Sequence, residues 1–193
     1  DGFGYSGVRL TPKPGQTLKV TVERTILARR LGRLTGAGLF AESQKLGEQL
    51  DWKESGVLGS DSVVTAKLGG KMLWFWGDTN LAHYPLGIFN VSAASTEKFV
   101  PPAKPPLRPP YAYVSERKTA QSELRPRGVA KVPGDGPTWI WGAITLPDAK
   151  GAPHLVAAAV KTKGAMQAYR WDLVEWDPHE ELFHPLDTVW TED

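Results

Sequence analysis

Cysteine is absent from this sequence of 193 residues, and its absence excludes several kinds of site. Without thiols there can be no disulfide framework, no thiol nucleophile, no thiolate-bound zinc and no cysteine-ligated cluster. A large excess of one charge is missing too, because 23 Lys and Arg stand against 21 Asp and Glu, a net charge of +2. Nucleic acid is therefore not expected as a partner, since its recognition depends on a strongly basic surface.

The sequence also lacks long apolar runs. No stretch of about 18 apolar residues occurs, so no transmembrane segment is predicted. The chain opens at Asp1 with neither an initiator Met nor the basic and apolar regions of a signal peptide. We interpret it as a mature or excised piece from which any targeting segment has been removed.

The residues that are abundant indicate an all-β fold. A hydrophobic content of 41% is sufficient for a core, so a largely disordered chain is not expected. The chain contains 20 Gly, 16 Pro and 8 Trp but only 2 Met. Such a supply of turn-forming and aromatic residues favours many short strands over helices.

The N-terminal part is predicted to be separate from the rest. Residues 1–25 are expected to be the tail of a β-sandwich-like element, because residues 17–24 alternate apolar and polar side chains as a half-buried strand does. Residues 26–55 are expected to hold a short helix and a linker. Over residues 26–34, three leucines recur at helical spacing, namely Leu27, Leu31 and Leu34.

From residue 56 onward the pattern predicts strands joined by tight turns. Residues 58–68 and 71–76 are expected to form a hairpin around a two-glycine turn. Residues 87–95 supply a third strand. Residues 100–110 hold too many prolines for a helix or a central strand, so they are expected to form an extended connector.

A second cycle of strands follows the connector. Four more strands are predicted, at residues 138–146, 154–160, 168–176 and 181–184. Two cycles of three or four strands without crossover helices are typical of β-propeller blades, with a β-sandwich as the main competitor.

The length of the chain limits the number of blades. Removing the first 57 of 193 residues leaves 136, which at roughly 45 residues per blade is about three blades at most. Closed propellers have about four to eight blades. We therefore predict that residues 56–193 form the first two to three blades of a propeller, a partial β-propeller that another polypeptide completes.

Two motif-like patterns predict neither a cofactor nor a metal. Residues 2–7 match G-x-G-x-x-G, but no strand precedes them and two prolines follow, so a dinucleotide site is not expected. His179 and His184 stand five residues apart instead of the four of a zincin helix, and an odd separation places them on opposite faces of a strand. A calcium ion at a propeller axis stays an alternative that no ligand pattern here supports.

Two neighbouring segments carry a family resemblance. Leu58–Val63 is L-G-S-D-S-V, and Leu73–Asn80 is L-W-F-W-G-D-T-N. This pair resembles the first blade of five-bladed propellers related to glycoside hydrolases, especially secreted bacterial proteins of uncharacterised type. The later segments W-I-W-G and Y-R-W-D-L-V-E-W-D resemble the second blade, so the likeness covers residues 56–190.

The resemblance implies a set of site residues. In the hydrolases of that fold, an Asp on the innermost strand of the first blade acts as base or nucleophile, and Asp61 matches this position. Asp78, at the end of the adjoining strand, is expected to line the same opening. Asn80, His83 and Tyr84 on the following loop are candidates for binding substrate.

Glycoside cleavage needs two carboxylates with different tasks. One protonates the leaving oxygen, and the other attacks or activates water. The sequence offers no convincing acid, and if the chain is a fragment we expect that acid on the missing blades. The structural alternative for Asp61 and Asp78 is that each accepts backbone N–H bonds in a turn.

The eight tryptophans divide into two groups, because an indole can pack in a core or stack on a sugar ring. Four lie in apolar runs and are expected in the core: Trp74, Trp76, Trp139 and Trp141. Four have polar neighbours and are candidates for exposure: Trp52, Trp171, Trp176 and Trp190. Among these we select Trp171 as a substrate-binding residue.

The residues and the resemblance support two functional hypotheses. The first is an extracytoplasmic protein that binds or processes a polysaccharide or glycan, with a glycoside hydrolase as its enzymatic form. The second is a non-catalytic extracellular structural or interaction protein, with a second polypeptide or neighbouring copies as partners. Carboxylates about 5 to 10 Å apart in a cleft favour the first. A buried, fully hydrogen-bonded Asp61 and a large apolar interface favour the second.

Overall fold

The structure is a computed structural model, and its described part has an all-β fold, as predicted. Among the described residues, thirteen strands form four antiparallel sheets, none of them closed, beside the short helix α2 (Trp52–Ser55). The described residues are 9–23, 25, 27–28, 30–36, 38–40, 43, 46–47, 52–88, 90–97, 107–117, 119, 125–164 and 166–192.

The first sheet is built around the predicted hairpin. It has the strand order β2-β3-β6-β7, with β2 (Val64–Leu68), β3 (Lys71–Trp76), β6 (Ser92–Thr96) and β7 (Ala112–Tyr113). Gly69 and Gly70 join β2 to β3 with φ angles of +57° and +82°. Both angles lie in the left-handed region that a two-residue hairpin turn of this kind requires, which explains the glycine pair.

A smaller sheet stands beside the first one, with the order β1-β4-β5. Its strands are β1 (Val57–Ser60), β4 (Thr79–Leu81) and β5 (Tyr84–Ile88). The single strand predicted over residues 58–68 is therefore wrong, because β1 pairs in the small sheet while β2 pairs in the first sheet. Three residues separate the two strands, and Ser62 among them has a φ of +52°. The strand predicted over residues 87–95 is divided in the same way, into β5 and β6.

The second sheet is a meander of four long strands at the four predicted places, but its last strand runs to Thr191 instead of ending at His184. Its strands follow one another in the order β10 (Thr138–Pro147), β11 (Pro153–Lys163), β12 (Gln167–Asp177) and β13 (Leu182–Thr191). Two aspartates cap its turns: Asp148 Oδ1 accepts the N–H groups of Lys150 and Ala152, and Asp177 Oδ1 accepts those of His179 and Glu180. A further pair, β8 (Ser115–Glu116) and β9 (Arg125–Pro126), completes the described strands.

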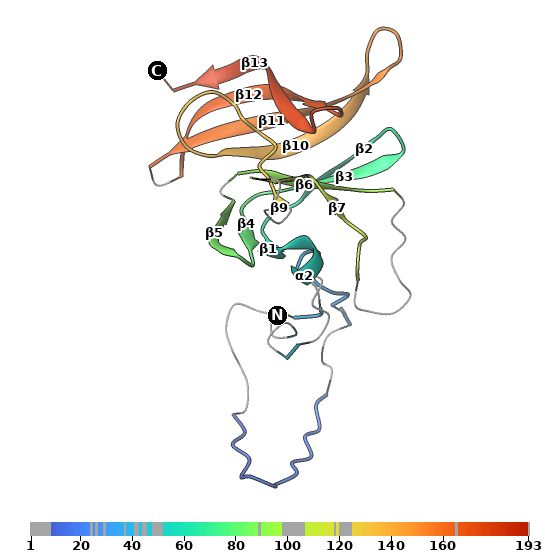
Figure 1. Ribbon diagram of the computed structural model, residues 1–193, viewed down its shortest axis with the longest axis vertical. Coiled ribbons are helices and arrows are strands. Elements are labelled where there is room, and N and C mark those ends of the chain that lie inside the picture. The colour runs from blue at the N-terminus through green and yellow to red at the C-terminus, as the bar shows by residue number, and fades with distance from the viewer. Residues whose placement is uncertain are drawn as a thin grey trace.

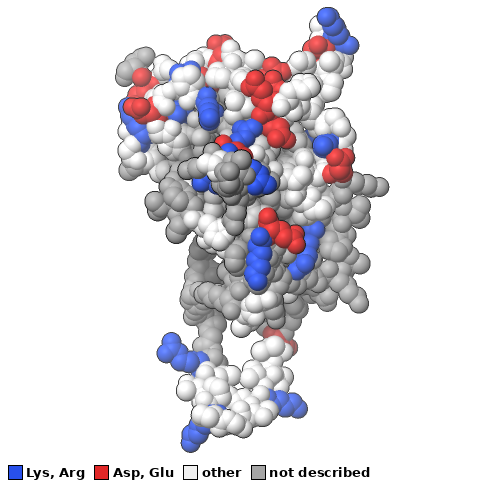
Figure 2. Space-filling model, viewed as in Figure 1, with Lys and Arg blue, Asp and Glu red and all other residues white. Residues whose placement is uncertain are grey.

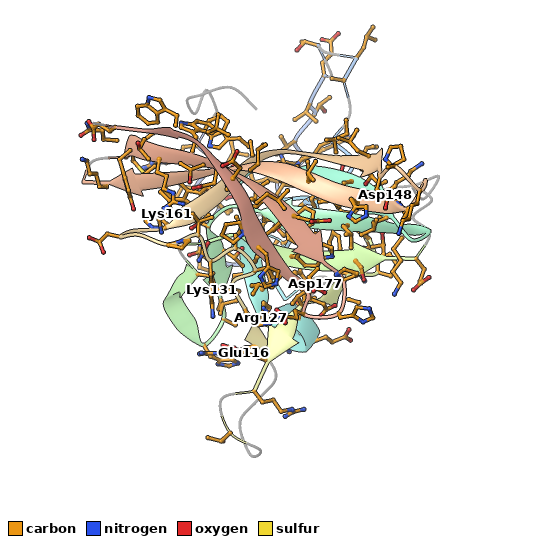
Figure 3. All side chains as sticks on the ribbon, turned by 90° about the horizontal axis from the view of Figure 1, so that it is seen from above. Glu116, Arg127, Lys131, Asp148, Lys161 and Asp177 are labelled. Atoms are coloured by element: carbon orange, nitrogen blue, oxygen red, sulfur yellow. The ribbon has the colours of Figure 1, made fainter. Side chains whose placement is uncertain are left out.

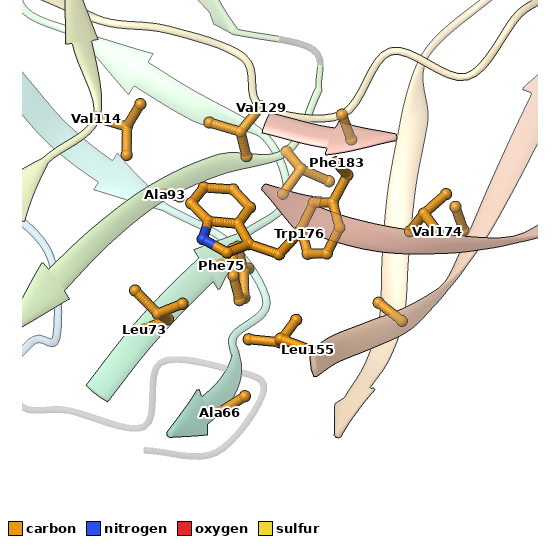
Figure 4. Packing of buried hydrophobic residues seen from close by; sticks show 14 of the residues in the cluster. Ala66, Leu73, Phe75, Ala93, Val114, Val129, Leu155, Val174, Trp176 and Phe183 are labelled. Carbon is orange, nitrogen blue, oxygen red and sulfur yellow. The ribbon is translucent and has the colours of Figure 1, made fainter. Parts of the chain in front are cut away.

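The two large sheets pack face to face, and their shared core lies between them (Figure 1). The Phe75 ring, on β3, lies 5.3 Å from the Trp176 ring and 5.0 Å from the Phe183 ring, measured between centroids. Figure 4 shows these three rings meeting at the centre of the cluster. Burying side chains of this size contributes about 1.5–3 kcal/mol each, so this contact holds the sheets together.

A connecting segment ties the edges of the two sheets. The N–H of Val129 donates to the carbonyl of Val91 (2.7 Å), and the N–H of Phe183 donates to the carbonyl of Val129 (2.8 Å). Val129 therefore links the start of the β6 region to β13 by backbone bonds, besides contributing a fully buried side chain to the core.

The tryptophan predictions are correct in part. Trp74 and Trp76 are buried, and Trp190 is exposed, as expected. Trp176 was expected to be exposed but is buried against Phe75, because its neighbours Glu175 and Asp177 point away on the alternate face of β12. Trp141 was expected in the core but is 69% exposed.

Two of the N-terminal predictions, the strand over residues 17–24 and the helix over residues 26–34, are wrong within the described residues. No strand forms over residues 9–23, and Leu18, Val20 and Val22 are exposed. No helix forms over the described part of residues 26–34, where Leu27 is 99% exposed. Alternation and helical spacing are only preferences, and they need a neighbouring surface to cover the apolar side.

Other parts of these predictions lie outside the described residues. Residues 1–8 and most of the proline-rich connector belong to them, and residues 107–110 have neither helix nor strand. The domain boundaries stay a prediction. Among the described residues, no helix has the length and hydropathy to cross a membrane.

Candidate functional site

The structure brings Asp61 and Asp78 together at the point where the chain passes between the small sheet and the first sheet. Asp61 lies between β1 and β2, and Asp78 lies between β3 and β4. The N–H of Asp61 donates to the carbonyl of Asp78 (3.0 Å), and the N–H of Gly77 donates to the carbonyl of Asp61 (3.1 Å). The N–H of Asp78 also donates to Asp61 Oδ1 (3.1 Å). The structural role considered for Asp61 is therefore present, but its side chain is exposed rather than buried.

Gly77 makes this close approach possible. A Cβ atom at this position would lie 2.4 Å from Asp61 Oδ1. Real Cβ contacts do not reach this distance, so any side chain at residue 77 would displace the Asp61 carboxylate. The glycine in the W-G-D sequence is thus explained by the carboxylate beside it.

Both aspartates line one cavity of about 310 Å³ between the two large sheets. Its walls come from the start of β2, the end of β3 and the start of β10. Three tryptophans contribute to these walls: Trp76, Trp139 and Trp141. The remaining lining residues are Ser62, Val64, Phe75, Gly77, Ile140 and Met166. Two carboxylates and three tryptophans therefore line a space that is large enough for a small ligand, and the indole of Trp139 contacts one of the carboxylates.

The environment of Asp78 favours its protonated form. Partial burial raises the pKa of Asp78 above its ordinary value, and the negative charge of Asp61 raises it further. The indole N–H of Trp139 opposes this by donating to Asp78 Oδ1 (3.2 Å), which lowers the pKa. Burial is the largest influence, so Asp78 holds a proton more readily than an exposed aspartate does.

The other predicted site residues are not brought into the cavity. Asn80 is exposed on β4, and His83 is exposed in the turn that follows it. Neither lines the cavity. Tyr84 begins β5, and its side chain lies outside the described part. Trp171, on β12, reaches the site only through Trp141, whose ring centroid is 6.2 Å from its own.

Trp139 and Trp141 belong to the site, although their apolar surroundings suggested a core position. A bulge in β10 between Ile140 and Gly142 leaves Trp141 without a partner in the register, and its ring lies beside Trp171 instead of in the core. The only signal in the sequence was the pair of tryptophans two residues apart, and this spacing does not distinguish a core strand from a cavity wall.

A second group of polar side chains lies at another end of the second sheet. Asp177, Glu180 and His184 each place one ligand atom within 4.8 Å of the others, and Glu180 Oε2 lies 2.9 Å from His184 Nε2. These side chains are mostly exposed, and such groups are common on surfaces without an ion. They are the residues that could hold a divalent cation, but the described part indicates no cofactor.

Charge over the rest of the surface is mixed. On the face in Figure 2, basic and acidic side chains are interspersed over the sheets. This distribution agrees with the near-balance of charges in the sequence.

Comparisons with protein-family models, with curated proteins and with solved structures find no match to this chain. Any functional conclusion therefore depends on the residues and the geometry described above.

Proposed function

We propose that this chain belongs to a protein that binds or processes carbohydrate, and that the cavity with Asp61 and Asp78 is its site. The observation that carries this proposal is the meeting of two carboxylates and three tryptophans in one cavity. Carboxylate pairs perform glycoside chemistry, and indole faces pack against the apolar faces of sugar rings. An extracytoplasmic location, where polysaccharides and glycans are met, is part of the proposal.

The arrangement of the two large sheets supports a partial propeller as the finer description of the fold. Both are four-stranded antiparallel sheets that pack face to face, and the first strand of each, β2 and β10, lies in contact with the other. In a propeller, four-stranded blades pack around a central channel. On this proposal β2 and β10 line the channel, and a second polypeptide or neighbouring copies supply the remaining blades.

The surroundings of the two carboxylates suggest how they divide the chemistry. Asp78 is the better acid, because burial and the charge of Asp61 raise its pKa. Asp61 is exposed and takes the part of nucleophile or base. In this scheme Asp78 gives its proton to the leaving oxygen while Asp61 attacks the sugar or activates a water. Asp78 thus fills the place for which the sequence offered no acid.

The test is hydrolysis and binding of a panel of polysaccharides and oligosaccharides. We expect Asp61→Asn and Asp78→Asn each to lower hydrolysis at least about a hundredfold, in the range for losing a general acid or base. Asp187→Asn is the matched control, since Asp187 is an exposed carboxylate on β13 outside the cavity. Loss of activity in the control, or full activity in both site variants, contradicts the assignment.

One observation favours the second hypothesis, a non-catalytic protein that assembles through its sheets. The second sheet leaves large apolar side chains exposed: Trp141, Ile144, Leu146, Leu173, Leu186 and Trp190. Apolar exposure on this scale marks interaction surfaces. Native mass measurement of the intact particle tests it, because assembly predicts a complex that Leu173→Ser and Trp190→Ser dissociate, while binding to glycans stays absent in every variant.

A further inference from the structure

We infer that Thr79 is a positioning residue, which holds Asp61 and Asp78 at a fixed separation through a chain of hydroxyl groups. The inference rests on the proposed function of the two aspartates. It assigns the control of their geometry to residues that do not line the cavity.

Thr79 stands between the two aspartates in the hydrogen-bond pattern. It follows Asp78 directly and is paired in register with Ser60, which directly precedes Asp61. The Thr79 hydroxyl donates to Ser60 Oγ (2.9 Å) and lies 2.7 Å from Ser92 Oγ. One hydroxyl therefore connects the residues next to both carboxylates.

The directions of these bonds follow from the chemistry of a hydroxyl group, which has one donor hydrogen and two acceptor sites. Because Thr79 donates to Ser60, the bond to Ser92 needs Ser92 as its donor. A longer contact of 3.4 Å to the Gly77 carbonyl competes weakly for the same hydrogen. The chain thus runs from Ser92 through Thr79 to Ser60.

The chain is anchored in rigid parts of the molecule. Ser92 is fully buried at the start of β6 and is paired in register with Trp76 of β3. At the other end, the N–H of Ser60 donates to Thr35 Oγ1 (2.9 Å). The hydroxyl chain therefore fixes the position of the aspartates relative to the central strands of the first sheet, β3 and β6.

The backbone of Thr79 is held independently of its hydroxyl. Thr79 pairs with Ser60 of β1 on one side and with Ile88 of β5 on the other. Gly87 permits this packing, since a Cβ there would lie 2.0 Å from the Thr79 carbonyl oxygen. Replacing the hydroxyl by a methyl group should therefore leave the strand pairing in place and remove only the side-chain hold on Ser60.

This hold has a chemical consequence for Asp78. It keeps the charge of Asp61 close to Asp78, and that charge is one cause of the raised pKa of Asp78. Without the Thr79 hydroxyl, Asp61 is held among the described residues only by its bonds to Gly77 and Asp78, and a wider separation of the two carboxylates lowers the pKa of Asp78 toward its ordinary value. Thr79 would then act on proton transfer without touching the substrate.

The experiment compares Thr79→Val with Thr79→Ser, which restores the hydroxyl. Thr96→Val is the matched control, because Thr96 is a buried threonine on β6, the strand that carries Ser92, and its hydroxyl accepts a bond from the indole N–H of Trp74 (3.0 Å), outside the chain of hydroxyls. Three quantities are measured: the titration of the Asp78 carboxyl by carbon-13 NMR, assigned with Asp78→Asn, the binding of oligosaccharides, and thermal unfolding.

We expect Thr79→Val to move the titration midpoint of Asp78 to lower pH and to weaken oligosaccharide binding about tenfold, as for the loss of one aligned hydrogen bond. Thr79→Ser should restore both. Thr96→Val should lower the thermal midpoint without moving the Asp78 titration. If Thr79→Val behaves like Thr96→Val, Thr79 is structural only and the inference is overturned.

Two further outcomes have a defined meaning. If Thr79→Val does not fold, Ser92→Ala tests the same chain from its other end, and an unchanged Asp78 titration in that variant overturns the inference. If the wild-type protein binds no oligosaccharide, the proposed function fails, but the titration still decides whether Thr79 positions the aspartates.

Discussion

The two large sheets have the same strand arrangement but differ in what covers their outer faces. On the first sheet, Trp74 and Trp76 are 8% and 2% exposed, whereas on the second sheet Trp141 and Trp190 are 69% and 45% exposed. The chain returns over the first pair with Tyr111, whose ring lies 5.4 Å from Trp74 and 5.0 Å from Trp76. Among the described residues, no segment returns over the second pair.

This difference shows that an aromatic strand does not by itself decide the fate of its side chains. Both sheets present indoles on the face away from the shared core, and burial depends on whether another segment packs there. The candidate site lies where the two situations meet, since its cavity is lined by the buried Trp76 and by the exposed Trp141.

The largest expected loss of stability comes from a substitution in the core that the two large sheets share. Phe75→Ala removes the ring that contacts Trp176 and Phe183, and we expect the free energy of unfolding to fall by about 3–5 kcal/mol. Trp190→Ala, on the uncovered face, should change it by about 0.5 kcal/mol or less. Chemical denaturation measures both. Similar losses in the two variants would contradict the contrast between the shared and the open face.

A smaller loss of stability is expected from breaking the hydrogen-bonded ion pair between Asp172 and Arg170 in the second sheet. The buried Asp172 carboxylate accepts bonds from Arg170 Nε (2.8 Å), Arg170 Nη2 (2.8 Å) and the Thr188 hydroxyl (2.7 Å). Asp172→Ala leaves the guanidinium without its charged partner, at a cost of about 2–3 kcal/mol, because Arg170 keeps some contact with water and its bond to the Thr188 hydroxyl. The exposed Asp187→Asn is the control. If the stability of Asp172→Ala is unchanged, the ion pair contributes nothing to the free energy of unfolding.

The packing of Tyr111 over the first sheet should become more stable when its hydroxyl group is removed. In the described part, the buried hydroxyl of Tyr111 has no hydrogen-bond partner, and burial raises the pKa of Tyr111, so the phenol stays neutral. Tyr111→Phe should therefore be neutral or should stabilise the protein by up to about 1 kcal/mol. Tyr111→Ala is the comparison, and it should destabilise. A marked loss of stability in Tyr111→Phe would reveal a partner for the hydroxyl.

The smallest effects concern the turns of the second sheet and depend on pH. Figure 3 places Asp148 at the end of this sheet opposite Lys161. The hydrogen bond that the His154 ring donates to the Glu175 carboxylate, together with the negative charges of Glu175 and Asp148, raises the pKa of His154 above its ordinary 6.5. This contribution to stability is present below pH 6.5 and is lost as the pH rises through the raised pKa.

Asp148 and Asp177 behave in the opposite sense. Backbone N–H groups hold the pKa of both carboxyls below the ordinary 3.8, so their contribution is present above pH 3.8 and is lost as the pH falls through the lowered pKa. The thermal midpoint should therefore be highest between these two limits. His154→Gln should remove the decline on the alkaline side and leave the decline in acid. An unchanged alkaline decline in this variant would exclude His154 as its cause.

Several elements of the fold follow from short stretches of sequence. The hairpin around Gly69 and Gly70 and the four strands of the second sheet were predictable, because their turns need residues with particular backbone angles or side-chain acceptors. The position of Asp78 at the end of its strand was also predictable, because its motif combines an aromatic strand with a turn-forming aspartate. Asp61 was expected inside a strand, but it lies between β1 and β2.

The remaining features depend on partners far away in the chain. The stretch that contains Asp61 looks like one strand, but its two halves pair with β4 and β3 in different sheets. Trp139 is 61 residues from Asp78, so nothing local indicates that its indole donates to that carboxylate. The alternating stretch around Val20 stays without strand structure, although its pattern resembles that of β2.

By itself, the sequence determined the strand content, the tight turns and the residues at the strand ends, because these depend on backbone preferences and on neighbours a few residues away. Only the tertiary structure decided which tryptophans are buried, which carboxylate has the raised pKa, and which hydroxyl groups are hydrogen-bonded next to the two aspartates. Burial, desolvation and hydrogen bonding between distant strands are properties of the packed chain, and they exist only once the two sheets meet.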